Sequence, residues 1–335
     1  MKIVLPTENY LYYLFQYYSR FFRNLLFPKF SRTRAHQSFP PSYTGIYSFT
    51  DKTINRWYRL FELDRKHAPW INFPYFCPAT IILFFELLSD LNIRFKDMLF
   101  ARWNIHRVSP GVRFLAHKQY QISITASALK ALTKTSIILC CTTEIKDPHS
   151  NESIAHATSF FKIKNRHNFY KDLLKRYQNQ NQNQNLNSPL LSSYSDHLFL
   201  GLSQQKATIT PTLATHSCDF FIPENMGLKF GRVSGDFSIT HTTHFTARLF
   251  GFPKAFIQGL CIGSYLIKHI TLKLQQPITS LEVYYCNQVY VNQCVRLNFK
   301  RSSTQENFYY FEIVDELKRL LVKGSFSTEH LQMTA

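Results

Sequence analysis

Two long apolar segments, each followed by a series of strand-like segments, constrain the fold of this chain more than any other feature. Residues 79–91 and 259–274 are long enough for buried helices, and the first follows Pro78, a residue suited to a first helical turn. Each is followed by segments rich in β-branched and aromatic residues, at 100–108, 120–126, 134–146 and 155–163, and again at 280–285, 293–300, 307–314 and 319–326. The chain therefore repeats one plan: a long helix, then about four antiparallel strands.

This repeated order predicts an α+β protein in which two antiparallel sheets each wrap round a long central helix, the arrangement known as the hot-dog fold. Two such units in one chain would pack as an internal pseudo-dimer, a double hot-dog. The length of 335 residues also exceeds the roughly 100 to 200 residues of a typical domain. We expect a non-catalytic hot-dog unit over residues 66–170 and a catalytic one over residues 216–335.

Two further segments differ in composition from these units. The composition of residues 1–65 predicts an aromatic-rich N-terminal helix followed by a basic, proline-containing connector. This helix either packs on the main body or lies on a membrane surface through residues 8–30. Arg20 and Arg23 interrupt it before the roughly 20 apolar residues that a spanning helix needs. Residues 171–215 contain the polar run QNQNQNQNLN and predict an exposed linker.

The charge balance narrows the classes of partner. Lys and Arg number 39 against 21 Asp and Glu, giving a net charge of +18 that attracts nucleic acid, anionic lipid or a polyanionic small molecule such as a coenzyme A conjugate. No nucleic-acid-binding motif is present, so we expect no specific nucleic acid partner and favour a phosphorylated coenzyme or an acidic carrier protein.

The cysteines and the N-terminus bear on the compartment. The seven cysteines are odd in number and show no CxxC spacing, which favours a reduced compartment and predicts neither a metal site nor a redox cofactor. The N-terminus lacks the smooth apolar region of a secretion signal, so we expect a cytoplasmic protein and leave mitochondrial import open.

One segment, residues 227–263, carries residues suited to catalysis. It contains Ser-Gly-Asp-Phe and a histidine five positions after the aspartate, then an Arg-Leu-Phe-Gly-Phe piece and a Gln-Gly pair before the second long helix. This segment resembles the MaoC-like acyl dehydratases, the (R)-specific enoyl-CoA hydratases and 3-hydroxyacyl-thioester dehydratases. The matching positions are Ser234, Gly235, Asp236, Phe237, His241, Ala247, Gly251, Phe252 and Gly259. Residues 99–108 with Pro110 are also similar to the first half of two-unit members, and no second Ser-Gly-Asp segment precedes residue 200.

The resemblance implies roles that also suit the chemistry. Hydration of a 2-enoyl thioester needs a base for water, an acid for the α carbon and a donor for the enolate oxygen. Asp236 and His241 are the candidate proton-transfer groups, and the backbone N–H of Gly259, at a helix start, is the candidate donor. The alternatives are a surface carboxylate, a hydrogen-bonded histidine and a plain helix-start glycine.

The segment departs from the family pattern at two places. Ser238 and Ile239 replace Asn-Pro, and Gln258 replaces the histidine before the glycine. We expect Ser238 and Gln258 to contact substrate, and Arg232 and Lys254 to bind coenzyme phosphates. The competing interpretation is an impaired hot-dog protein that binds acyl thioesters or assembles with fatty-acid enzymes. Under either interpretation the chain can also form a homodimer.

Overall fold

The computed structural model describes residues 2–4, 41–63, 78–91, 93, 98–108, 115–133, 135–164, 170–176 and 216–329. The first half contains β1 (Lys2–Val4), β2 (Ser42–Ser48), α2 (Asp51–Leu60), α3 (Pro78–Asp90), β3 (Met98–Val108), β4 (Gln119–Thr133), β5 (Ser136–Lys146) and β6 (Ser153–Lys164). The second half contains β7 (His216–Ile222), α7 (Met226–Ser234), the 3₁₀ turn η6 (Ile239–His241), α8 (His244–Leu249), α9 (Gly259–Leu274), β8 (Ile278–Tyr285), β9 (Gln293–Arg301), β10 (Phe308–Asp315) and β11 (Leu320–Thr328).

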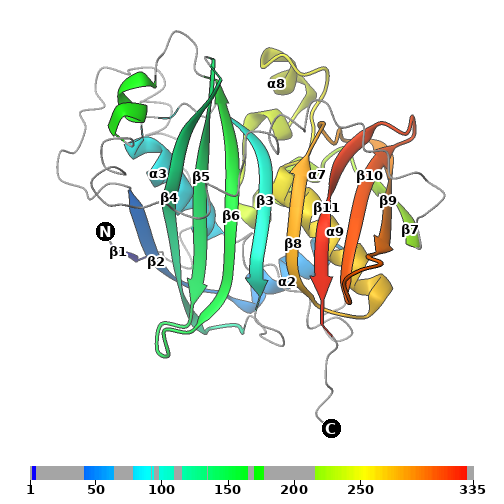
Figure 1. The fold of residues 1–335 in the computed structure, drawn as a ribbon, viewed down its shortest axis with the longest axis horizontal. Coiled ribbons are helices and arrows are strands. Elements are labelled where there is room, and N and C mark those ends of the chain that lie inside the picture. The colour runs from blue at the N-terminus through cyan, green and yellow to red at the C-terminus, as the bar shows by residue number, and fades with distance from the viewer. Residues whose placement is uncertain are drawn as a thin grey trace.

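Both halves contribute to one large sheet. In the described part of the chain its eleven strands run in the order β1-β2-β4-β5-β6-β3-β8-β11-β10-β9-β7, antiparallel apart from the β1–β2 pair. The first half thus reads β2-β4-β5-β6-β3 and the second reads β7-β9-β10-β11-β8, which is the same order of equivalent strands. Strands β3 and β8 occupy equivalent places and pair with each other, so they join the halves (Figure 1).

The two long helices lie on one face of this sheet and form a shared core. Figure 1 shows α3 and α9 behind the strands, with α2 between them. Leu83 and Leu87 of α3, like Leu266 and Ile270 of α9, have no exposed surface, and each burial contributes about 1.5–3 kcal/mol to folding. One continuous cluster of buried hydrophobic residues spans both halves. Neither helix is amphipathic in the usual sense, because each is largely enclosed.

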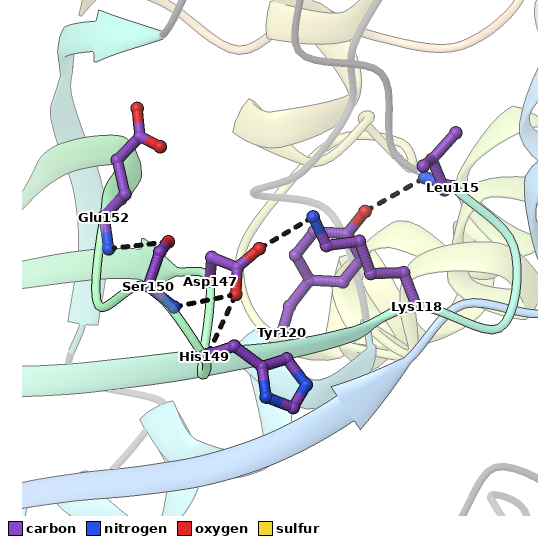
Figure 2. A network of polar contacts seen from close by, with 7 residues as sticks. All are labelled: Leu115, Lys118, Tyr120, Asp147, His149, Ser150 and Glu152. Carbon is purple, nitrogen blue, oxygen red and sulfur yellow. Dashed lines mark hydrogen bonds and ion pairs between the residues drawn. The ribbon is translucent and has the colours of Figure 1, made fainter.

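A polar network closes the turn between β5 and β6 (Figure 2). The carboxylate of Asp147 accepts hydrogen bonds from the backbone N–H groups of His149 (2.9 Å) and Ser150 (3.3 Å), and it pairs with the Lys118 ammonium at 2.7 Å. The hydrogen bond from Lys118, followed by that from His149, lowers the pKa of Asp147 to about 2. The network therefore links Lys118, just before β4, to the turn that joins β5 and β6.

The expected helices and strands are present in both halves. The segments expected at 79–91 and 259–274 are α3 and α9, and the eight expected strands are β3 to β6 and β8 to β11. Their ends differ from the expected ones by one or two residues, except that β4 continues seven residues beyond the expected end at residue 126. Strands β1, β2 and β7 and helices α2 and α7 were not predicted from the sequence. Strands β1 and β2 and helix α2 lie within residues 1–65, where we expected one aromatic-rich helix followed by a basic connector.

Several expectations fall partly or wholly outside the described residues. The N-terminal helix, including residues 8–30, lies there, as does the QNQNQNQNLN run. Of the expected linker 171–215, residues 171–176 form a short helix, and Leu173 and Leu174 in it pack against the core. Within the described residues, no helix combines the length and hydropathy needed to cross a membrane.

Candidate active site

The turn after α7 presents Asp236. Helix α7 ends at Gly235, whose φ of 85° lies in the left-handed region that glycine adopts without strain. The buried Ser234 hydroxyl donates to the Phe230 carbonyl (2.9 Å) and accepts from the Asp236 backbone N–H (3.1 Å). Each residue of the Ser-Gly-Asp sequence therefore has a structural role in this turn. The serine ends the helix, the glycine reverses the chain, and the aspartate follows at a position fixed by the serine hydroxyl.

Ser238 holds the carboxylate of Asp236. Oδ1 of Asp236 accepts a hydrogen bond from the Ser238 backbone N–H at 3.1 Å and another from the Ser238 hydroxyl. This is the side-chain-to-backbone pattern with which Asp organises a turn. Ser238 is buried and precedes η6, so its hydroxyl orients the carboxylate from within the fold.

His241, at the end of η6, is held in one tautomer. Its Nδ1 lies 2.8 Å from the Phe256 carbonyl oxygen, an atom that can only accept, so Nδ1 carries the proton and Nε2 keeps its lone pair. The Phe256 backbone is itself held by pairing with Tyr290. Burial lowers the pKa of His241, against the opposing effects of the Asp236 charge and the Phe256 hydrogen bond. The imidazole is therefore neutral at pH 7 and can accept a proton at Nε2.

Gln258 ties the parts of the site together. Its side-chain Nε2 donates to the carbonyl of Gly227 (3.0 Å) and to that of Asp236 (2.8 Å), while its own backbone caps the start of α9. Gly227 also touches the backbone of His241, because a Cβ there would lie 1.9 Å from the His241 carbonyl oxygen. Gln258 is buried, and its Oε1 has no hydrogen-bond partner among the described residues.

Gly259 begins α9 between two aromatic rings. A Cβ at this position would lie 2.4 Å from Phe100 Cδ1 and 3.1 Å from Tyr285 Cζ, so the absence of a side chain lets β3 and β8 approach the helix. The Tyr285 hydroxyl donates to the Gly259 carbonyl at 2.8 Å. As the first residue of a helix, Gly259 has an N–H without a partner inside that helix. Glycine at this position therefore allows the close packing of Phe100 and Tyr285, and it leaves the N–H at the helix start without a side chain beside it.

The structure brings some of the expected site residues together and leaves others apart. Asp236, Ser238, His241 and Gln258 converge at the start of α9, where Gly259 follows directly. Gln258, which we expected to contact substrate, uses its amide to hold two backbone carbonyls. Arg232 is exposed in the last turn of α7, and the Lys254 ammonium lies 5.5 Å from the centre of the Tyr290 ring, so neither belongs to this group.

Four residues that shape the site were not recognised from the motif: Phe256, Phe100, Tyr285 and Gly227. The Phe256 carbonyl acts through its backbone, which no side-chain pattern reveals. Phe100 and Tyr285 come from β3 and β8, far from the motif in sequence. The signal that could have pointed to Gly227 was its place at the start of the segment that matched the family, since a glycine in a helix has a conformational cost that a close contact can explain.

This arrangement can perform acid–base chemistry with a carboxylate, a neutral imidazole and a helix N-terminus. Among the residues that the structure describes, no three His, Cys, Asp or Glu side chains are grouped as metal ligands would be. The Cys261 thiol, one turn into α9, is buried, and that burial raises its pKa, so it is a poor nucleophile.

Comparison with known proteins gives a clear result for the fold. No family model matches the sequence, and no curated protein matches it either. Among solved structures, HtdX of Mycobacterium tuberculosis superposes with a TM-score of 0.61 at 11% identity, over 86% of this chain and 100% of that one. A MaoC-like dehydratase from Phytophthora capsici gives 0.60 at 11% identity, over 87% and 95%.

A third similar structure is longer. The full-length peroxisomal multifunctional enzyme type 2 of Drosophila melanogaster superposes with a TM-score of 0.59 at 12% identity, over 86% of this chain. This chain spans 48% of that enzyme, about half its length. The expected likeness to MaoC-like proteins is thus confirmed for the fold, which is an α+β hot-dog fold.

Proposed function

We propose that the chain catalyses the hydration of trans-2-enoyl thioesters to (R)-3-hydroxyacyl thioesters and the reverse dehydration, as a double hot-dog protein of the MaoC-like family. The observation that carries the proposal is that the Asp236 charge acts on His241, raising its pKa against the effect of burial, while the Phe256 carbonyl holds the tautomer of that histidine. The fold shared with MaoC-like dehydratases supports it, and the (R) configuration rests on that likeness alone.

Each group has a role in the proposed reaction. A water molecule held by the Asp236 carboxylate and by Nε2 of His241 loses a proton to this pair as its oxygen bonds to C3 of the substrate. The double-bond electrons move toward C2 and the thioester oxygen, where the Gly259 N–H stabilises the enolate charge. The abstracted proton is returned at C2, which completes the addition of one water without any other reactant.

The two halves have different roles in this proposal. The second carries Asp236 and His241, while the first contributes the Phe100 ring, which touches Gly259. We propose that the first half shapes the acyl site, and that the substrate is carried by coenzyme A or an acyl carrier protein. Arg232 and Lys254 are proposed to bind the coenzyme phosphates. A cytoplasmic or mitochondrial location and a homodimer are part of the same proposal.

The test is an optical assay with enoyl-CoA substrates of increasing chain length. Hydration removes the conjugated absorbance without releasing free thiol, and a thiol reagent in a parallel sample reports hydrolysis. We expect loss of absorbance with no thiol. Thiol release would show a thioesterase. Saturable binding of acyl-CoA with neither signal would favour the impaired acyl-binding protein. This outcome is included because Ser238, Ile239 and Gln258 depart from the family pattern.

A further inference from the structure

Exposed apolar side chains gather on and beside α8. Of the ten large hydrophobic side chains that are exposed in the described part of the chain, four lie within residues 239–250. We call Ile239, Phe245, Leu249 and Phe250 the α8 patch. Phe245 is 71% exposed and Leu249 68% exposed, values typical of side chains that stand out from the surface. Isolated exposed hydrophobic residues are normal, whereas a cluster marks an interaction site.

The α8 patch has a defined shape, because the helix is anchored on its other side. Phe245 and Leu249 are four residues apart and share one face of α8, while Ala247 on the opposite face has no exposed surface. The Thr246 hydroxyl donates to the Ile239 carbonyl at 2.5 Å, so η6 lies against α8.

Two contacts at the ends of α8 complete this anchoring. His244 Nδ1 accepts from the Ala255 backbone N–H at 3.0 Å, and the Arg248 Nε donates to the Pro253 carbonyl at 3.2 Å. Helix α8 is therefore fixed to the loop that leads to α9. In Figure 1 it lies at the upper edge of the molecule, clear of the sheet.

Basic side chains outnumber acidic ones around the patch. From Glu224 to Phe256 the sequence holds four Lys and Arg residues against two acidic residues, Glu224 and the candidate active-site residue Asp236. Arg248 is exposed between Phe245 and Leu249, and Arg232 is exposed at the end of α7. The nearby Glu224 carboxylate lies 3.3 Å from His244 Nε2. An apolar patch bordered by basic side chains complements a partner whose surface is anionic and whose interior is apolar.

We propose that the α8 patch docks the protein on an anionic lipid bilayer, with Phe245 and Leu249 entering the boundary between headgroups and acyl chains and Arg248 pairing with lipid phosphates. A bilayer fits better than a protein partner because these side chains project from a six-residue helix. A fluid surface receives projecting rings without a matching groove. This proposal stands independently of the proposed reaction, although docking would bring His241, three residues before α8, close to the lipid surface.

The experiment is co-sedimentation of the full chain with vesicles of phosphatidylcholine, alone or with about a third phosphatidylglycerol. We expect binding to the anionic vesicles, weakened by high salt. The double substitution Phe245→Ser with Leu249→Ser should lower the affinity about tenfold or more, and Arg248→Gln should weaken binding to anionic vesicles specifically. Leu317→Ser is the matched control, because Leu317 is 89% exposed in the turn between β10 and β11 and should not matter.

Three outcomes would overturn the proposal. Failure of the parent protein to bind either vesicle would remove the bilayer as partner. Unchanged binding by the folded double variant would place the membrane contact elsewhere, for example in residues 8–30. Binding to an acidic carrier protein that the double variant abolishes, without vesicle binding, would make the patch a protein-docking surface. Circular dichroism confirms folding in each case.

Discussion

Arg102 of β3 and Glu282 of β8 form an ion pair across the strands that join the two halves. The Arg102 side chain is 5% exposed and the Glu282 side chain 28% exposed, so the guanidinium is the more deeply buried partner. The guanidinium carbon also lies 4.7 Å from the centre of the Tyr284 ring and 5.2 Å from that of Phe160. The junction therefore combines a partly buried ion pair with cation–π contacts.

Glu282→Gln should destabilise the protein more than Arg102→Met does. Removing the carboxylate charge takes an ion-pair partner from a buried guanidinium, which costs about 3 kcal/mol, whereas the carboxylate left by the methionine variant is partly exposed to water. Asp219→Asn is the control, because the Asp219–Arg296 pair is more than half exposed and solvent screens the attraction between its charges. Urea unfolding measures all three. Equal free energies of unfolding for Glu282→Gln and Asp219→Asn would contradict a structural role for the junction pair.

Asp236→Asn and His241→Ala should each lower the hydration rate by about 100-fold or more while leaving the fold intact, because each removes a proton-transfer group. His149→Ala is a suitable histidine control, since it lies in the exposed β5–β6 turn and contributes its backbone N–H to Asp147. Initial rates and circular dichroism are the measurements. A near-parental rate in either site variant would move the chemistry away from this pair.

The pH dependence of activity follows from His241. Because burial lowers its pKa below the ordinary 6.5, the neutral, proton-accepting imidazole persists to more acidic pH. We expect the acid limb of kcat/KM to be centred below pH 6.5 and the profile to be flat from about pH 7.5 to pH 8. A profile measured on enoyl-CoA checks this. An acid limb centred at or above pH 6.5 would show that the histidine is more solvated than its contacts indicate.

Gly259→Ala should destabilise the chain despite the helix propensity of alanine. A new Cβ would meet Phe100 at 2.4 Å, and the strain of about 1–3 kcal/mol exceeds the roughly 1 kcal/mol that replacing a helical glycine can contribute. Adding Phe100→Leu should relieve part of the loss, so the two substitutions should be non-additive. Gly263→Ala, which meets Trp103 at 2.8 Å, should not be rescued by Phe100→Leu. Additive thermal shifts for Gly259 and Phe100 would argue against their contact.

Ser238→Ala should reduce activity about tenfold, equivalent to 1.4 kcal/mol, because the Asp236 carboxylate loses the hydroxyl donor that orients it. From the sequence we expected Ser238 to contact substrate, and in the structure its hydroxyl donates to the Asp236 carboxylate. Ile239→Pro is the control, since Ile239 starts a 3₁₀ turn where a proline is tolerated. A fully active Ser238→Ala would mean that the Ser238 backbone N–H is sufficient.

The long helices and most strands could be predicted because their signals are local. An apolar run such as residues 259–274 and the strand-like composition of residues 280–285 and 293–300 depend on neighbouring residues alone. Strands β2 and β7 were missed because they carry weaker signals. The sequence SYTGIYS contains a glycine, and HSCDFFI mixes polar and apolar residues without a regular period.

The sequence by itself determined the two long helices, the eight strands β3 to β6 and β8 to β11 and their repeated order, and it singled out Asp236 and His241 as candidates. It could not determine which nitrogen of His241 is protonated, because that depends on a backbone carbonyl fifteen residues away, at Phe256. It could not place Phe100 on Gly259 or pair β3 with β8, since these contacts join residues more than 150 positions apart. Only tertiary packing decides such contacts: their geometry is set by how the two halves share one core and one sheet, which no local pattern encodes.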